Sequence, residues 1–88
     1  MICKKIIVKG EVQGVGFRYF IKKEAERLGI KGYAMNKNEF VEIVAQGEAK
    51  QVEELIRICE AGSRFTNVTD IETIEIKIGD YKEFVIKH

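Results

Sequence analysis

Two kinds of hydrophobic periodicity follow one another along the 88 residues, and their order restricts the possible folds more than any other feature of the sequence. A period of two predicts strands, and a period of three to four predicts amphipathic helices. The strand-like segments are residues 3–9, 30–36, 40–46, 68–78 and 83–87. The helix-like segments are residues 17–28, followed by Gly29, and residues 48–61, followed by Gly62. The order is therefore β-α-β-β-α-β with a short terminal strand.

This order, at this length, is that of the split β-α-β arrangement. We predict an α+β fold of the ferredoxin-like α/β plait type, in which two helices cover one face of an antiparallel sheet and a short C-terminal strand is added. No repeat, low-complexity tract or Ser/Pro/Gly-rich linker divides the chain. We therefore expect residues 1–88 to form a single domain.

The apolar positions of these segments identify the expected core. In residues 68–78, the side chains of Ile74, Ile76 and Ile78 alternate with polar ones, which predicts one long strand. Both cysteines are expected to be small buried side chains, since they are too few and too far apart for a zinc site. The expected core residues are Cys3, Ile6, Val8, Phe17, Ile21, Ala25, Leu28, Val41, Ile43, Ala45, Val52, Leu55, Ile56 and Cys59.

Composition and charge exclude several classes of partner. Fifteen Lys and Arg residues stand against fourteen Asp and Glu residues, a net charge of +1 that does not favour binding to a nucleic-acid backbone. No apolar run approaches the roughly 20 residues that a membrane helix needs. The N-terminal segment also lacks the long apolar core of a secretory signal. We expect a cytoplasmic monomer that binds neither nucleic acid nor membranes.

The segment EVQGVGFR, residues 11–18, places two glycines and an arginine where the first helix begins. Arg18 lies in the first turn, where the helix dipole disfavours cations, and no Ser, Thr, Asp or Asn stands at the expected N-cap. A bound anion would resolve both difficulties. Gly14 and Gly16 allow backbone N–H groups to converge on it, and the planar guanidinium of Arg18 matches two phosphate oxygens. A G-x-G spacing alone, however, is typical of an ordinary strand-to-helix turn beside a surface arginine.

The predicted topology brings a second polar residue near this loop. A right-handed crossover makes the first two strands parallel, so the loop after the first strand and the hairpin after the second lie at the same end of the sheet. Asn36 stands at the end of that second strand. We therefore expect residues 11–18 and Asn36 to be close in space, although an Asn beside a hairpin is commonly a simple turn former.

Residues 8–18, VKGEVQGVGFR, closely resemble the G-x-V-Q-G-V-x-F-R loop of the acylphosphatase family. A second block of that family, G-aromatic-small-x-N before a Val-rich strand that ends in Gly, resembles GYAMN at 32–36 and VEIVAQG at 41–47. With the order of the elements, the resemblance covers essentially the whole chain.

The resemblance implies a small hydrolase that cleaves acyl phosphates to a carboxylate and inorganic phosphate without a metal ion or cofactor. By position, Arg18 and Asn36 are the implied catalytic residues, and Asn36 would orient the attacking water. The chemistry requires only positioning and charge stabilisation. The implied phosphate-binding residues, mainly through their backbone N–H groups, are Gln13, Gly14, Val15, Gly16, Phe17 and Arg18.

Two departures from the family pattern keep an alternative open. Lys37 follows Asn36 in place of the usual Thr, and the turn formed by Asn38, Glu39 and Phe40 is one residue shorter than usual. A degenerate acylphosphatase-like module that binds an anion or a protein without turnover is therefore the alternative function.

An RNA-recognition domain has the same order of elements but is disfavoured, since residues 40–47 contain Glu42 and no cluster of aromatic side chains. Acylphosphatases usually have Gly-Pro after the second helix, whereas this chain has Gly62 and Ser63. The single histidine, His88, is expected to be solvated.

Overall fold

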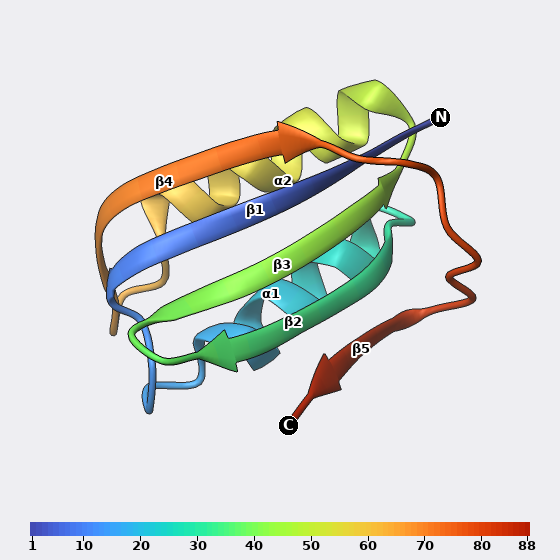
Figure 1. Cartoon of the computed structure of the whole chain (residues 1–88). Coiled ribbons are helices and arrows are strands. Elements are labelled where there is room, and N and C mark those ends of the chain that lie inside the picture. Colours follow the sequence, from blue (N-terminus) through green and yellow to red (C-terminus); the bar gives the residue numbers. More distant parts are fainter.

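The computed structural model describes residues 1–88 as two helices packed on one five-stranded sheet. In chain order the elements are β1 (Ile2–Glu11), α1 (Phe17–Arg27), β2 (Lys31–Lys37), β3 (Phe40–Gly47), α2 (Ala49–Ala61), β4 (Asn67–Glu75) and β5 (Phe84–Lys87). The strands lie in the order β4-β1-β3-β2-β5, and both helices cover the same face of the sheet (Figure 1). The predicted α+β architecture is confirmed.

The core lies between the helices and the sheet. Alternate residues of β3, namely Val41, Ile43 and Ala45, are fully buried under the helices, as their period of two predicts. The predicted stripe of α1 is also confirmed, because Phe17, Ile21 and Ala25 are buried and Leu28 packs against the core. On α2 the buried residues are Val52, Leu55 and Cys59.

Both cysteines are free and fully buried, as expected. Burial raises the pKa of the Cys59 thiol to about 12, so this group stays protonated at neutral pH. Burial also raises the pKa of Cys3. Neither thiol is therefore available as a nucleophile.

The β2–β3 turn is tighter than the sequence suggested. Lys37, expected to lie between the two strands, instead ends β2 and pairs with Phe40 at the start of β3. Only Asn38 and Glu39 form the turn, and Asn38 has a positive φ of 44°. Asn tolerates this left-handed conformation better than most residues, which is why a two-residue connection is possible here.

β4 departs from the predicted long strand. It ends at Glu75, and Ile74 and Ile78 are 60% and 49% exposed, so the alternating isoleucines do not line the core. The residues of β4 that pack against the core are Val68 and Ile71. They are three positions apart, and a register shift opposite Lys9 and Gly10 allows both to face the helices.

The sheet is mixed rather than wholly antiparallel. Residues 76–83 cross the ends of the central strands, where the side-chain amide of Gln46 exchanges two hydrogen bonds with the backbone of Gly79, at 2.8 and 3.0 Å. The chain then joins the far edge, where β5 pairs in parallel with β2 (Figure 1). The direction of β5 depends on this crossing, a long-range connection with no local signal.

β5 is held to the rest of the protein by Phe84, which is 1% exposed and pairs with Gly32. Phe84→Ala is expected to lower the free energy of unfolding by about 3 to 5 kcal/mol, because it removes a large buried ring and leaves a cavity. Urea denaturation followed by circular dichroism measures this loss. Phe65→Ala is the matched control, since Phe65 is 68% exposed and its loss is expected to cost no more than about 0.5 kcal/mol. Equal effects of the two substitutions would contradict the assignment of β5 to the core.

Candidate functional site

The loop after β1 and the end of β2 meet at one end of the sheet, as the topology predicted. β3 is antiparallel to both β1 and β2, so these two strands run in the same direction. Figure 1 shows the β1–α1 loop and the β2–β3 hairpin at the same end of the molecule. A cavity of about 220 Å³ lies there and is lined by Val12, Gly14, Gly16, Phe17, Arg18, Tyr19, Asn36, Ile86 and His88.

The glycine loop has the backbone conformation that its sequence predicts. Gly14 and Gly16 both have a φ of +78°, in the left-handed region. A Cβ atom at either position would meet nothing within 4 Å, so the backbone conformation and not the space requires glycine. The two residues turn the chain sharply before the first turn of α1.

The N-terminus of α1 has no cap from the protein. Gly16 is the N-cap residue, no side chain caps the helix, and its first turn contains no acidic residue. The first backbone hydrogen bond of the helix runs from the N–H of Phe20 to the carbonyl of Gly16, so the N–H groups of residues 17–19 have no acceptor in the chain. Together with the helix dipole, these free donors make the cavity favourable for an anion.

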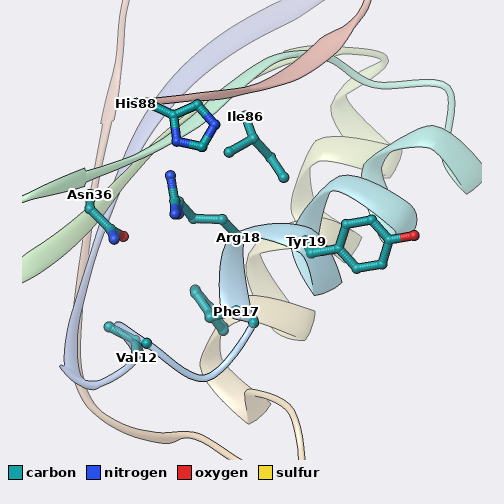
Figure 2. Close-up of a pocket in the computed structure, with 9 residues that line it drawn as sticks. Val12, Phe17, Arg18, Tyr19, Asn36, Ile86 and His88 are labelled. Atoms are coloured by element: carbon teal, nitrogen blue, oxygen red, sulfur yellow. The ribbon is translucent and has the colours of Figure 1, made fainter.

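Arg18 lies on the cavity side of α1, next to a residue that anchors the helix. Phe17 is 1% exposed and packs in the core, so it can offer the cavity only its backbone. The half-buried guanidinium of Arg18 lies within the cavity (Figure 2), and its Nη1 donates one hydrogen bond to the carbonyl of Lys87 at 2.9 Å. Its other donors make no hydrogen bond within the protein, so they are free to bind oxygens of a ligand in the cavity.

Asn36 faces Arg18 from the end of β2, and its carboxamide points into the space between them (Figure 2). Because a carboxamide both donates and accepts hydrogen bonds, it can orient a water molecule. The altered hairpin therefore leaves Asn36 at the cavity, as the sequence predicted from topology.

Of the other residues expected to bind phosphate, Gln13 and Val15 belong to the loop but do not line the cavity. Val15 is 39% exposed. The side chain of Gln13 instead joins the loop to the hairpin, since its Nε2 donates to the carbonyls of Asn38 at 3.0 Å and Phe40 at 2.9 Å. These bonds fix the loop relative to the strand that carries Asn36.

Four lining residues were not among the predicted site residues: Val12, Tyr19, Ile86 and His88. Val12 and Tyr19 flank the predicted loop, and a wider window around it would have included them. Ile86 and His88 come from the end of the chain, which reaches the site only because β5 is parallel to β2. His88 is exposed, as expected, but its ring also lines the cavity (Figure 2).

No Asp or Glu side chain lines the cavity, and its only ionisable lining side chains are Arg18, Tyr19 and His88. No group of three or more His, Cys, Asp or Glu side chains in the protein is arranged to hold a metal ion. The lining residues can therefore bind an anion with backbone N–H groups and one fixed cation, Arg18.

A separate finding concerns the helices: neither is long and apolar enough to span a bilayer.

Comparison with known proteins agrees with this geometry. The acylphosphatase family model matches residues 4–86. An acylphosphatase of Petrotoga mobilis is 39% identical over 89 residues, which cover all of both chains. The crystal structure of an acylphosphatase from Bacillus subtilis superposes with a TM-score of 0.96 at 37% identity, and the match covers 100% of both chains. A full-length HypF in a phosphate- and nucleotide-bound form matches 99% of this chain with 12% of its own, at 31% identity and a TM-score of 0.93.

Gln13→Ala is expected to loosen the glycine loop because it removes both hydrogen bonds to the hairpin. Each bond contributes about 0.5 to 1.5 kcal/mol, and exposure favours the lower end. Hydrogen exchange measured by NMR should show faster exchange for backbone N–H groups near the loop and hairpin. Gln51→Ala, on the exposed side of α2, is the control and should leave these rates unchanged. Unchanged rates in Gln13→Ala would contradict this role.

Proposed function

The chain belongs to the acylphosphatase family and is an enzyme that hydrolyses acyl phosphates, and on this premise we propose that its glycine loop and Arg18 bind the phosphoryl group while Asn36 orients the attacking water. The observation that carries the proposal is the meeting of three features in one cavity: an uncapped helix N-terminus, the guanidinium of Arg18 and the carboxamide of Asn36. A binding module without turnover is not favoured by this family membership.

Phosphate binding follows from the donors at the start of α1. The phosphoryl oxygens accept hydrogen bonds from the loop backbone, with the N–H groups of Gln13, Gly14, Val15, Gly16, Phe17 and Arg18 as the proposed donors. The guanidinium of Arg18 binds two further oxygens, and its bond to the carbonyl of Lys87 holds it in place. The site is formed before the substrate arrives, so little reorganisation is needed when charge develops on the phosphoryl group.

The reaction is the in-line attack of water on phosphorus. The bond from phosphorus to the bridging acyl oxygen breaks, the carboxylate leaves with the bonding electrons, and the proton of the water passes to an oxygen of the phosphoryl group. Carboxylic acids ionise near pH 4, as the reference pKa values of about 3.9 for Asp and about 4.3 for Glu show. The departing carboxylate is therefore a stable anion at neutral pH and needs no general acid to leave. We propose accordingly that neither a metal ion nor another cofactor takes part.

A single chain suffices for this site, because all nine lining residues belong to it. We propose that the protein acts as a monomer and that residues 1–88 are one domain. Both cysteines are free, which is consistent with the reducing conditions of the cytoplasm, the proposed location. Neither nucleic acid nor a membrane is a proposed partner.

Arg18→Ala is expected to reduce kcat/KM for acetyl phosphate by about 100-fold to 1000-fold, since it removes a preorganised stabiliser of the transition state. Arg18→Lys should recover little, because an ammonium lacks the planar pair of donors. Inorganic phosphate should raise the Tm of the native protein but not of Arg18→Ala. Arg57→Ala is the matched control, since Arg57 is exposed on α2 and pairs only with Glu54. Near-native turnover of Arg18→Ala would contradict the proposed site.

Asn36→Ala is expected to lower kcat strongly while the Kd of inorganic phosphate stays within a few-fold of the native value. The physical reason is that an uncharged carboxamide adds little attraction for the phosphate dianion but acts on the water of the transition state. Steady-state kinetics and calorimetry on the same preparation measure both quantities, with Asn67→Ala at the start of β4 as control. A large loss of phosphate affinity with unchanged kcat would show that Asn36 binds phosphate instead.

A further inference from the structure

The end of β5 forms a wall of the cavity that phosphate binding and water positioning leave unused. This wall consists of Ile86 in β5 and His88, the residue that follows the strand. We propose that His88 is a specificity-determining residue for the acyl group, and that its protonated imidazole favours acyl phosphates whose acyl group carries an anionic substituent, such as a second carboxylate. The inference rests on the function proposed above, because it takes the phosphoryl group to lie between the glycine loop and Arg18.

The position of His88 follows from the register of β5. The parallel pairing aligns Ala34 with Ile86 and Met35 with Lys87, so His88 comes level with Asn36 one position further on. Side chains alternate between the faces of a strand, which places Ile86 and His88 on the face of Ala34, toward the helices. The imidazole of His88 and the guanidinium of Arg18 both line the cavity (Figure 2).

Lys87 points to the other face of the sheet. Its Nζ lies 4.0 Å from the centroid of the Tyr33 ring, and Tyr33 alternates with the core residue Ala34. Only the backbone of Lys87 takes part in the site, where its carbonyl accepts the hydrogen bond from Arg18. The side chains of Lys87 and His88 therefore lie on opposite faces of the sheet, and only that of His88 reaches the cavity.

The acyl group of the substrate must contact the part of the cavity wall that neither the phosphoryl group nor the attacking water occupies. If the phosphoryl group occupies the loop side and the water lies at Asn36, the acyl group is left with Ile86 and His88. The methylene groups of an acyl chain can pack on Ile86, and a polar substituent beyond them reaches the imidazole.

The charges around His88 favour an anionic substituent. α1 presents Arg18 to it, while the ring of Tyr19 points away from His88 (Figure 2), β2 presents the uncharged Asn36, and the glycine loop presents no ionisable side chain. No Asp or Glu side chain lines the cavity, so no acidic side chain competes there with the substituent of a substrate. An imidazole loses its positive charge when the pH rises, so the preference for an anionic substituent should fall with rising pH.

Two substrates of nearly equal shape isolate this effect. Succinyl phosphate ends in a carboxylate, and butyryl phosphate ends in a methyl group on a chain of the same length. They share the same reacting phosphoryl group, so ionisation of that group cancels in the ratio of their kcat/KM values. The ratio of kcat/KM for succinyl phosphate to that for butyryl phosphate is to be measured between about pH 5.5 and pH 8, the range in which histidine titrates.

In the native protein the ratio should fall by about five-fold as the pH rises, the size expected for one pair of unit charges about 4 Å apart and in contact with water. His88→Gln should give a low ratio that is independent of pH, and His88→Lys a high ratio that is also independent of pH. Lys87→Gln is the matched control, because it removes the neighbouring positive charge on the opposite face of the sheet. It should preserve the pH dependence of the native protein.

A pH-independent ratio in the native protein, or the same pH dependence in His88→Gln, would overturn the role of His88. Both results presuppose that butyryl phosphate is hydrolysed with a rate that depends on Arg18. If hydrolysis of butyryl phosphate did not depend on Arg18, the proposed phosphate site itself would be wrong, and the role of His88 with it. Hydrolysis of butyryl phosphate by the native protein and by Arg18→Ala, measured in the same series, separates the two failures.

Discussion

β3 is hydrogen-bonded in antiparallel register to two neighbours, β1 on one side and β2 on the other, and the location of the site depends on this double pairing. Two strands that are both antiparallel to a third are parallel to each other, so the chain leaves β1 and β2 at the same end of the sheet. The glycine loop follows β1 and Asn36 ends β2, and so both reach one cavity. The pairing is stabilised by burial, since Val41, Ile43, Val44 and Ala45 of β3 are at most 1% exposed. The most buried strand of the protein therefore determines where its exposed chemistry lies.

A domain of this size has little interior to enclose a substrate, and the site solves this with backbone rather than with depth. The N-terminus of a helix supplies several N–H donors and a partial positive charge without any buried polar side chain. Phe17 and Arg18 show how the site is fixed, because one side chain enters the core while the next enters the cavity. The first turn of α1 is thereby anchored by hydrophobic burial. Gly14 and Gly16 then allow the chain to reach that turn with its donors free.

Local patterns in the sequence predicted most of the fold because each helix and central strand carries its own periodicity. Phe17, Ile21 and Ala25 are buried as their spacing requires, and Asn36 reaches the cavity because the crossover rule determines the relative direction of β1 and β2. The edges of the sheet were predicted less well. An edge strand has only one neighbour, so apolar residues such as Ile74 can alternate regularly and still face solvent. The direction of β5 depends on the path of residues 76–83 across the molecule, which no local pattern contains, and His88 was therefore not assigned to the site.

β5 is the shortest strand, with four residues, yet it joins the core, the sheet and the cavity. Phe84 is buried at its start, the carbonyl of Lys87 accepts a hydrogen bond from Arg18, and His88 lines the cavity just beyond its end. The position of the guanidinium is therefore coupled to the docking of this strand, and the docking depends mainly on one aromatic ring. Since the free energy of local opening is lowest where few apolar contacts hold an element, β5 is the element whose opening would first displace Arg18. The geometry of the anion site depends in this way on a buried residue that is distant from it along the strand and has no part in its chemistry.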